Sequence, residues 1–424
     1  MQYRKRFAGT VVCGCAVAIL GSDKAMAQEA LRTALESDTS ARLRNEPVVG
    51  LSTNVLRWGA ATFEISLSYS LEATDNSTFV ETDRQKDLIQ RPLLTVGVRY
   101  PLSPQARLSF RTGVGYEDYI DNTVEDTFFI PSSELALDVS AGNAVVTFFD
   151  RFDYSQDVAE VGALSGVGVF PQLENEVGLR SVWNFDKWVY QAGYSHLNVF
   201  VIGDSGPGTT NFSYLARAEE LFFGRAGYNF DSPVQLGIEV TGGWADYVEK
   251  IQPDYYDVSA GPYLTWTAAD ALEISLRGGV VYTVFSSTNG LSEEEELTSF
   301  YAGLTIDHRL TDNITYGFSA THDIQPAISL GSDYIETTRL ELDVEWDMTR
   351  RLTLTSLIYG EAAEEVGDVV TEQYNRFGIG IGPIYQVSRH FSCFARYAFN
   401  LKDSDIESHS YRENQVTIGV AYRF

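Results

Sequence analysis

The chain has 424 residues, of which 21% are charged and 44% hydrophobic, and its formal net charge is −27. It contains no stretch of about 18 or more apolar residues, which excludes a bundle of membrane-spanning helices. The acidity argues against general nucleic-acid binding, which needs clustered Lys and Arg, and the 24 Tyr and 24 Phe argue against a disordered chain.

Residues 1–27 have the features of a signal peptide. A basic start at residues 4–6 precedes an apolar run over residues 7–21. Ala25 and Ala27 then match the small-x-small pattern of a signal-peptidase site, which predicts cleavage after Ala27. An uncleaved membrane anchor is the alternative, but the apolar run is short for one.

The sequence contains three cysteines, and the predicted cleavage removes two of them. Cys15 is a poor lipoprotein site, because Cys13 stands where a small or β-branched residue is usual. Cleavage leaves Cys393 alone, so the mature chain forms no intrachain disulfide.

Residues 28–59 precede the strand pattern. Residues 28–37 (QEALRTALES) fit a short helix, which is too short to be stable alone. Two interpretations stay open for the whole segment: a disordered periplasmic tail, and a segment that partly plugs the lumen or contacts a periplasmic partner.

From residue 60 to residue 424, apolar residues alternate with polar residues or Gly, as in β-strands with one apolar face. Tight polar turns recur, for instance at residues 102–105 and 311–313, and longer acidic stretches such as 72–90 and 156–172 lie between them. Short turns at one end and long loops at the other are typical of an outer-membrane barrel, whereas a soluble sandwich mixes loop lengths. The sequence therefore predicts an all-β, antiparallel, up-and-down transmembrane β-barrel.

The count of turns predicts about 18 strands, and a count of 16 stays open. The least certain strands are those near residues 135–140, which is short, and 148–153, where Asp150 falls on the lipid-facing side unless a bulge intervenes. Four Trp residues lie beside predicted short turns and predict an aromatic girdle at the periplasmic interface. They are Trp183, Trp188, Trp266 and Trp346.

The C-terminus is a further signal of the barrel. Val416, Ile418, Val420, Tyr422 and Phe424 alternate with less apolar residues, and the chain ends on Phe. This resembles the terminal strand of bacterial outer-membrane barrels, in which the final aromatic residues are part of the assembly signal; here Tyr422 and Phe424 fill that role.

The signal peptide, the ladder of hairpins and the terminal Tyr422-Arg423-Phe424 resemble the putative outer-membrane β-barrel porins of proteobacteria, in particular the putative β-barrel porin type two group. The resemblance covers almost the whole mature chain, but its motifs are architectural. It implies the outer membrane of a Gram-negative bacterium and, since such genes often lie beside exopolysaccharide genes, a role in polysaccharide export. No catalytic motif carries over.

The alternation also predicts which charged side chains face the lumen. Opposed charges on a pore wall filter polar solutes, whereas charges that pair with one another only satisfy a wet interior, and both interpretations stay open. The candidates for the pore lining are Arg107, Arg111, Arg180, Arg277, Arg339, Glu239, Glu273, Glu341 and Asp343.

Much of the acidity falls in predicted outer loops. The acidic runs at residues 117–126, 293–296 and 361–368 either bind divalent cations that bridge lipopolysaccharide phosphates or form a solvated, repelling surface. No calcium-loop pattern occurs, and we expect no metal site and no cofactor. No hydrolase or metalloprotease motif occurs either, so we expect no enzyme.

Three hypotheses on function remain: a channel for passive passage of small hydrophilic solutes, a conduit for exopolysaccharide export, and a structural or adhesive barrel without transport. The expected partners are outer-membrane lipid and lipopolysaccharide, the barrel-assembly machinery, and small polar solutes or a polysaccharide, with no nucleic acid. The sequence gives no decisive signal for a homo-oligomer, which stays open.

Overall fold

The computed structural model describes residues 56–121, 124, 126–155, 163–167, 170–201, 212–230, 233–269, 271–287, 295–367 and 371–424. The predicted signal peptide and most of the segment 28–59 lie outside these residues. No helix among them is long and apolar enough to cross a membrane. The elements are β1 (Leu56–Trp58), β2 (Ala61–Thr74), β3 (Asp87–Pro101), β4 (Ala106–Tyr119), β5 (Thr127–Ala141), β6 (Ala144–Ser155), β7 (Gln172–Phe185), β8 (Trp188–Val201), η3 (Ser213–Leu215), β9 (Arg217–Asn229), β10 (Val234–Tyr247), β11 (Tyr255–Ala269), β12 (Leu272–Phe285), β13 (Glu295–Thr311), β14 (Ile314–Pro326), β15 (Tyr334–Thr349), β16 (Leu352–Val366), β17 (Glu372–Gln386), β18 (Phe391–Ser404), η4 (Glu407–His409) and β19 (Tyr411–Arg423).

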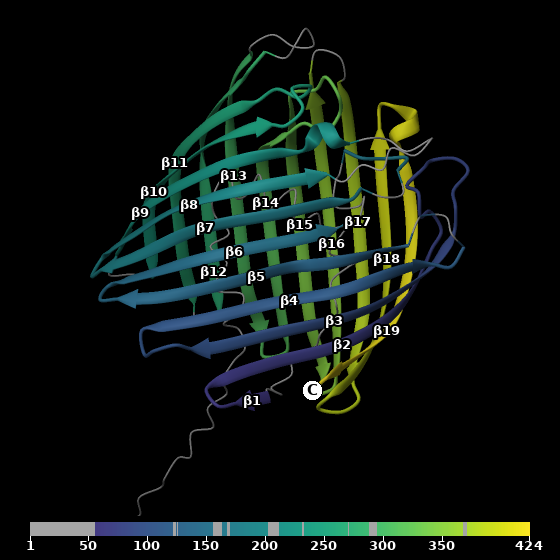
Figure 1. Cartoon of the computed structure of the whole chain (residues 1–424), viewed down its shortest axis with the longest axis horizontal. Coiled ribbons are helices and arrows are strands. Elements are labelled where there is room, and N and C mark those ends of the chain that lie inside the picture. The colour runs from purple at the N-terminus through teal and green to yellow at the C-terminus, as the bar shows by residue number, and fades with distance from the viewer. Residues whose placement is uncertain are drawn as a thin grey trace, which may run out of the picture.

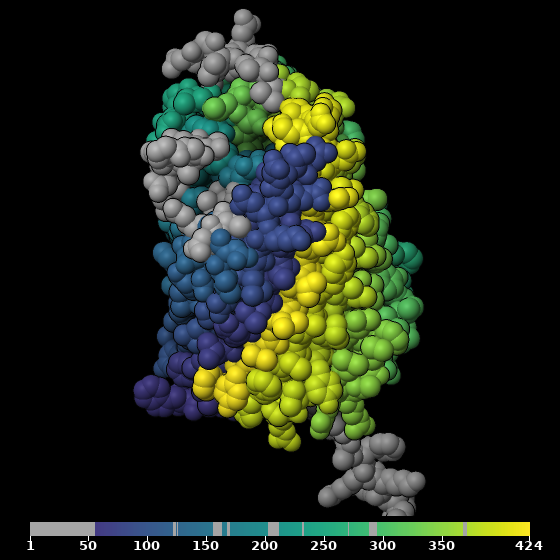
Figure 2. Space-filling model, turned by 90° about the vertical axis from the view of Figure 1, so that its right-hand side faces the viewer, coloured from purple at the N-terminus to yellow at the C-terminus, as the bar shows by residue number. Residues whose placement is uncertain are grey.

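The described strands β2 to β19 form one closed antiparallel barrel of 18 strands, which confirms the larger of the two predicted counts (Figure 1). Each strand pairs with its neighbour in sequence, and the last strand closes on the first. The closure runs from Gln415 opposite Thr74 to Arg423 opposite Ser66. Figure 2 shows this seam, where the C-terminal strand lies along the N-terminal strands. Closure gives every strand two partners, so no edge is left open to lipid.

The two faces of the wall differ in the way that the alternation predicts. Ile238 and Val240 are 62% and 47% exposed, whereas Glu239 between them is 2% exposed. Successive residues of a strand point to opposite faces, so the apolar pair faces outward and Glu239 faces the bore. The same pattern continues around the wall and makes an apolar outer belt suited to lipid.

The ends of the barrel also differ, and we call them the turn end and the loop end. At the turn end, the connections are tight; Gly142 and Asp186 take positive φ angles of 60° and 51° there, as two-residue hairpin turns require. The loop end carries the longer connections, of which residues 156–171 and 202–216 are the longest. The strand at 135–140, predicted to be short, belongs to the full-length β5, which has a register shift between Ile130 and Ser133.

Three of the Trp residues predicted for the girdle, and Asp150, lie on the outer face, as the alternation predicts. Trp188, Trp266 and Trp346 are exposed on the outer face at the turn end, and Trp188 stacks on Tyr190. Asp150 lies opposite the exposed Leu135 and Val177, so it faces outward. Its carboxylate accepts a hydrogen bond of 2.8 Å from the amide of Asn175, which satisfies part of its polarity.

Strand β1 lies in the described part of the segment 28–59, and it pairs with the first strand of the barrel. Strand β2 extends beyond the end of β19, where Phe424 donates its backbone N–H to Ile65. Beyond that point β1 pairs with β2, with Leu56 opposite Phe63. On the same edge of β2, β1 therefore pairs with the part of the strand that β19 does not reach.

Large inward rings lie over inward glycines of neighbouring strands. A Cβ built on Gly378 would lie 2.1 Å from the ring of Tyr359, and one built on Gly193 would lie 2.0 Å from the ring of Phe223. Only a residue without a Cβ lets the ring lie against the backbone. Such ring-on-glycine contacts flatten aromatic side chains against the wall and keep them out of the bore.

An apolar cluster occupies the loop end inside the barrel, and we call it the mouth core. It combines inward wall residues of β8, β15, β16, β17 and β19 with residues of four loops. Its buried members are Phe79, Ala163, Leu164, Phe170, Leu197, Val199, Val201, Phe212, Tyr214, Leu215, Ile328, Ile335, Ala363, Tyr374 and Tyr411.

The position of these strands shows that the mouth core crosses the bore. Strand β8 contributes Leu197 and Val199, and strand β17 contributes Tyr374. In the closed order these two strands are nine places apart in a ring of eighteen, so they lie on opposite walls. Barrels of about this size usually enclose an aqueous lumen. At the loop end of this barrel, the described residues instead form a packed apolar layer.

Candidate functional site

The nine charged residues proposed for the pore lining all occupy the inward phase of their strands. Arg107 and Arg111 lie on β4, Arg180 on β7, Glu239 on β10, Glu273 and Arg277 on β12, and Arg339, Glu341 and Asp343 on β15. Outward neighbours such as Leu276, Leu340 and Phe110 are exposed apolar residues. The structure does not bring the nine together at one place, because they are spread around the bore and along its length.

Arginines gather on one side of the bore toward the turn end. This basic wall comprises strands β3, β4, β18 and β19, which flank the closure seam. Arg107 and Arg111 make no hydrogen bond or ion pair with any described residue, and Arg99 pairs with Glu64 at 3.0 Å. The members of the basic wall are Arg99, Arg107, Arg111, Arg396 and Arg423.

Carboxylates gather on the facing side at a similar height. This acidic wall comprises strands β12, β13 and β15. Strands β12 and β13 are nine places from β3 and β4 in the closed order, so the two walls face each other across the bore. The members of the acidic wall are Glu273, Asp307, Asp343, Glu345 and Asp347.

Nearer the loop end, the inward charges pair with one another. Arg339 lies 2.9 Å from Glu361 and 3.5 Å from Glu341, and Arg376 also contacts Glu361. Nearer the turn end, Glu239 pairs with Arg225 at 2.6 Å. Both interpretations of the inward charges therefore apply, because some inward charges pair with one another, whereas Arg107 and Arg111 of the basic wall are exposed and make no ion pair with a described residue.

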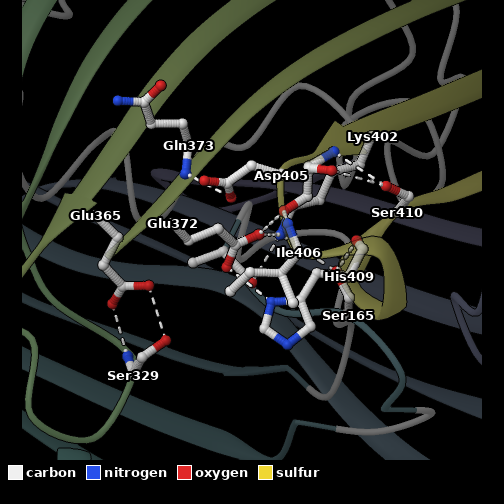
Figure 3. A network of polar contacts seen from close by, with 12 residues as sticks. Ser165, Ser329, Glu365, Glu372, Gln373, Lys402, Asp405, Ile406, His409 and Ser410 are labelled. Carbon is white, nitrogen blue, oxygen red and sulfur yellow. Dashed lines mark hydrogen bonds and ion pairs between the residues drawn. The ribbon is translucent and has the colours of Figure 1, made fainter. Parts of the chain in front are cut away.

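Lys402 of β18 holds the β6–β7 loop inside the mouth (Figure 3). Its ammonium group donates hydrogen bonds to the carbonyl of Ala163 at 2.9 Å and to the hydroxyl of Ser165 at 3.2 Å. It also pairs with Glu372 at 3.0 Å, and both side chains are fully buried. His409 contacts the other oxygen of Glu372 at 2.8 Å. A buried charge needs such partners, so the loop and the ion pair depend on each other.

Glu365 of β16 holds the β14–β15 loop in the same way (Figure 3). Its carboxylate accepts hydrogen bonds from the backbone N–H groups of Ile328 and Ser329, at 2.9 and 2.7 Å, and from the Ser329 hydroxyl at 2.7 Å. Tyr214 of η3 donates its hydroxyl to the carbonyl of Ile328 at 2.9 Å. Burial, and then the charge of Glu365, raise the pKa of Tyr214 to about 12, so this donor keeps its proton at neutral pH.

Sequence reasoning missed this arrangement. The acidic run 361–368 was placed in an outer loop, but β16 extends to Val366, and Glu361 and Glu365 face inward. The run 117–126 likewise begins within β4, where Glu117 pairs with Arg91. The signal in the sequence was that the alternation of apolar and polar residues continues into both acidic runs, which indicates that the strands continue there. Among the described residues, no group of three or more His, Cys, Asp or Glu is arranged to hold a metal ion.

Three solved structures are similar to the chain at low sequence identity, and one of them, OmpT, is described as an outer membrane protein. OccAB3 of Acinetobacter baumannii is 12% identical, with a TM-score of 0.45, and the match covers 87% of this chain and 100% of that one. OccK2 of Pseudomonas aeruginosa is 12% identical, with a TM-score of 0.47 and coverages of 85% and 98%. OmpT of Vibrio cholerae is 12% identical, with a TM-score of 0.38 and coverages of 88% and 100%. No curated protein sequence matches the chain.

A family model described as putative beta-barrel porin 2 matches residues 218–424. The match begins at the start of β9 and includes the terminal strand β19, whose pairing with β2 closes the barrel. The orientation follows, with the short turns in the periplasm and the long loops outside. This match covers just under half of the chain, so over residues 218–424 the chain is similar to the putative beta-barrel porin 2 family. The barrel lies in the outer membrane of a Gram-negative bacterium.

Proposed function

We propose that this barrel is a channel for the passive passage of small hydrophilic solutes, and that the mouth core narrows its outer end. The observation that carries the proposal is the pair of facing walls, because inward arginines and carboxylates that face a bore attract and orient polar solutes and water. A barrel that served only as an adhesive scaffold would need no such lining.

Export of a polysaccharide is the weaker alternative. A polymer has to pass the level at which β8 and β17 share one apolar core, and a hydrated chain makes poor contacts with such a layer. Small solutes need only a local opening at that level.

Liposome swelling tests the proposal. Purified protein is reconstituted, and swelling is followed with neutral sugars of increasing size, for wild type and for Glu365→Ala, which frees the β14–β15 loop. We expect slow entry of small sugars with wild type and faster entry, with a higher size limit, with the variant. Liposomes that stay impermeable with both proteins would overturn the channel function.

A further inference from the structure

Five polar side chains interrupt the apolar outer face of strands β6 to β9, and we call them the outer polar patch. They are Asp150, Asn175, His196, Asn198 and Glu220. Asp150, His196 and Glu220 lie in one row across the wall, and a ring nitrogen of His196 is 2.9 Å from the Glu220 carboxylate. Asn175 lies opposite Asn198 in the next row toward the loop end. Residues far apart in sequence thus form one polar area on the outside of the barrel.

The direction of these side chains follows from their neighbours. Leu197 and Val199 of β8 point inward and belong to the mouth core, so Asn198 between them points outward. Glu220 is the outward neighbour of Glu219, whose carboxylate is buried beside Arg217. The outer polar patch therefore lies on the face that the rest of the wall presents to lipid.

The outer polar patch also lies at the depth of the apolar belt. On the same strands, the exposed Phe148 lies nearer the turn end and the exposed Phe200 lies nearer the loop end. Other outward carboxylates, such as those of Asp118 and Asp246, belong to the last residue but one of their strands at the loop end. Polar groups on a lipid-facing surface are unfavourable, so a polar partner that covers the patch would stabilise the barrel.

Within one barrel, the two asparagines of the patch leave amide groups unused. Asn175 donates hydrogen bonds to Asp150 at 2.8 Å and to the backbone carbonyl of Arg151 at 3.2 Å. These bonds use both of its N–H groups but not its carbonyl oxygen. The side chain of Asn198 makes no hydrogen bond with a described residue. One acceptor on β7 and two donors on β8 are therefore left over.

The positions of Asn175 and Asn198 make them complementary to a second copy of themselves. The two residues are paired in register and lie equally far from the turn that joins β7 and β8. A twofold axis along the membrane normal, between β7 and β8, brings Asn198 of each copy to the level of Asn175 of the other. In such an isologous contact the same surface meets itself, so both unused donors and both unused acceptors find partners.

We propose that the outer polar patch is the contact surface between two copies of this chain, which stand side by side in the outer membrane with β7 and β8 at the centre of the contact. Amides that pair across such a contact hold transmembrane segments together. Acyl chains, which are the lipid groups at this depth, offer an amide neither donor nor acceptor. The proposal concerns the outer face and does not rest on the channel function.

Cross-linking in isolated outer membranes tests the contact. Val177, an exposed outward residue next to the asparagines, is changed to Val177→Cys in a Cys393→Ala background, and a mild oxidant is added. We expect a covalent dimer, because a position close to a twofold axis meets itself in the partner. Gly360→Cys is the matched control, since Gly360 lies on β16, nine places from β7 and as far from the turn end of its strand. It should stay monomeric.

Asn198→Leu tests the amides themselves. It should lower the association constant, measured by sedimentation in detergent micelles, by about tenfold or more, since two hydrogen bonds are lost. His322→Leu is the control and should leave the constant unchanged, because His322 is an outward residue of β14 that bonds to Thr338 of its own barrel. Leucine suits the lipid-facing surface, and heat-modifiable migration on gels checks that each variant is folded.

Equal cross-linking at the two cysteine positions would overturn the proposal, as would an association constant that Asn198→Leu leaves unchanged. A covalent product of Val177→Cys with a different protein would show that another partner covers the outer polar patch, which also contradicts the proposal.

Discussion

At the scale of single residues, the inward glycines set how closely the aromatic rings approach the wall. Gly378 lies under Tyr359, and a Cβ there would clash with the ring. Gly378→Ala should therefore lower the free energy of unfolding by about 1–3 kcal/mol, the usual effect of overpacking. Denaturant titration of the refolded barrel, followed by tryptophan fluorescence, measures the change.

Gly360→Ala is the matched control, because a Cβ at Gly360 meets nothing within 4 Å. It lies on β16, next to Tyr359 in the chain, and should leave the unfolding midpoint unchanged or raise it slightly. If both variants lowered the midpoint equally, the ring contact would not be the reason that glycine is needed at Gly378.

Lys402 holds the β6–β7 loop inside the mouth. Lys402→Met leaves the fully buried Glu372 without its ammonium partner and frees the carbonyl of Ala163. Breaking a buried ion pair from one side costs on the order of 3–5 kcal/mol. The β6–β7 loop should then leave the mouth and become sensitive to protease added to whole cells.

Lys250→Met is the control for that experiment. Lys250 pairs with Asp246 and Asp254 on the exposed surface of the β10–β11 connection, where an ion pair contributes little. Cleavage of the β6–β7 loop should stay at the wild-type rate in this variant. Equal cleavage of both variants would show that Lys402 does not hold the loop.

At the scale of elements, β1 protects an edge. It pairs with the part of β2 that β19 does not reach, and an unpaired strand edge in or near lipid is unfavourable. Replacing residues 56–58 by Gly-Ser-Gly should lower, by several degrees, the temperature at which the folded band on gels converts to the unfolded one. An unchanged conversion temperature would mean that β1 adds nothing to the seam.

The facing walls make a prediction on ion selectivity. The double variant Arg107→Glu and Arg111→Glu reverses two charges of the basic wall that pair with no described residue, so three arginines face two new carboxylates there and the wall loses most of its positive charge. The reversal potential in a KCl gradient should shift toward cation selectivity. Arg350→Glu, in an exposed periplasmic turn, is the control and should leave the potential near its wild-type value.

At the scale of the whole molecule, strict alternation made the fold predictable. The alternation at Ile238, Glu239 and Val240 predicts which side chains face lipid and which face the bore, and the terminal Phe424 indicates the strand that closes the barrel. The bore was harder to predict, because the mouth core joins residues from strands and loops that are far apart in sequence, such as Phe79 and Tyr411, whose rings lie 5.3 Å apart. The hydrogen bonds of Lys402 to Ala163 and Ser165 likewise depend on the position of a loop that no local pattern shows.

We propose that a bore with charged walls crosses the membrane, and that the mouth core, held by Lys402 and Glu365, narrows this bore at its outer end. Planar-bilayer recording of wild type beside Lys402→Met tests this claim most directly. We expect small or brief current steps for wild type and larger, longer ones for the variant, because the loop that Lys402 holds is released. No current from either protein, or the same large current from both, would contradict the account.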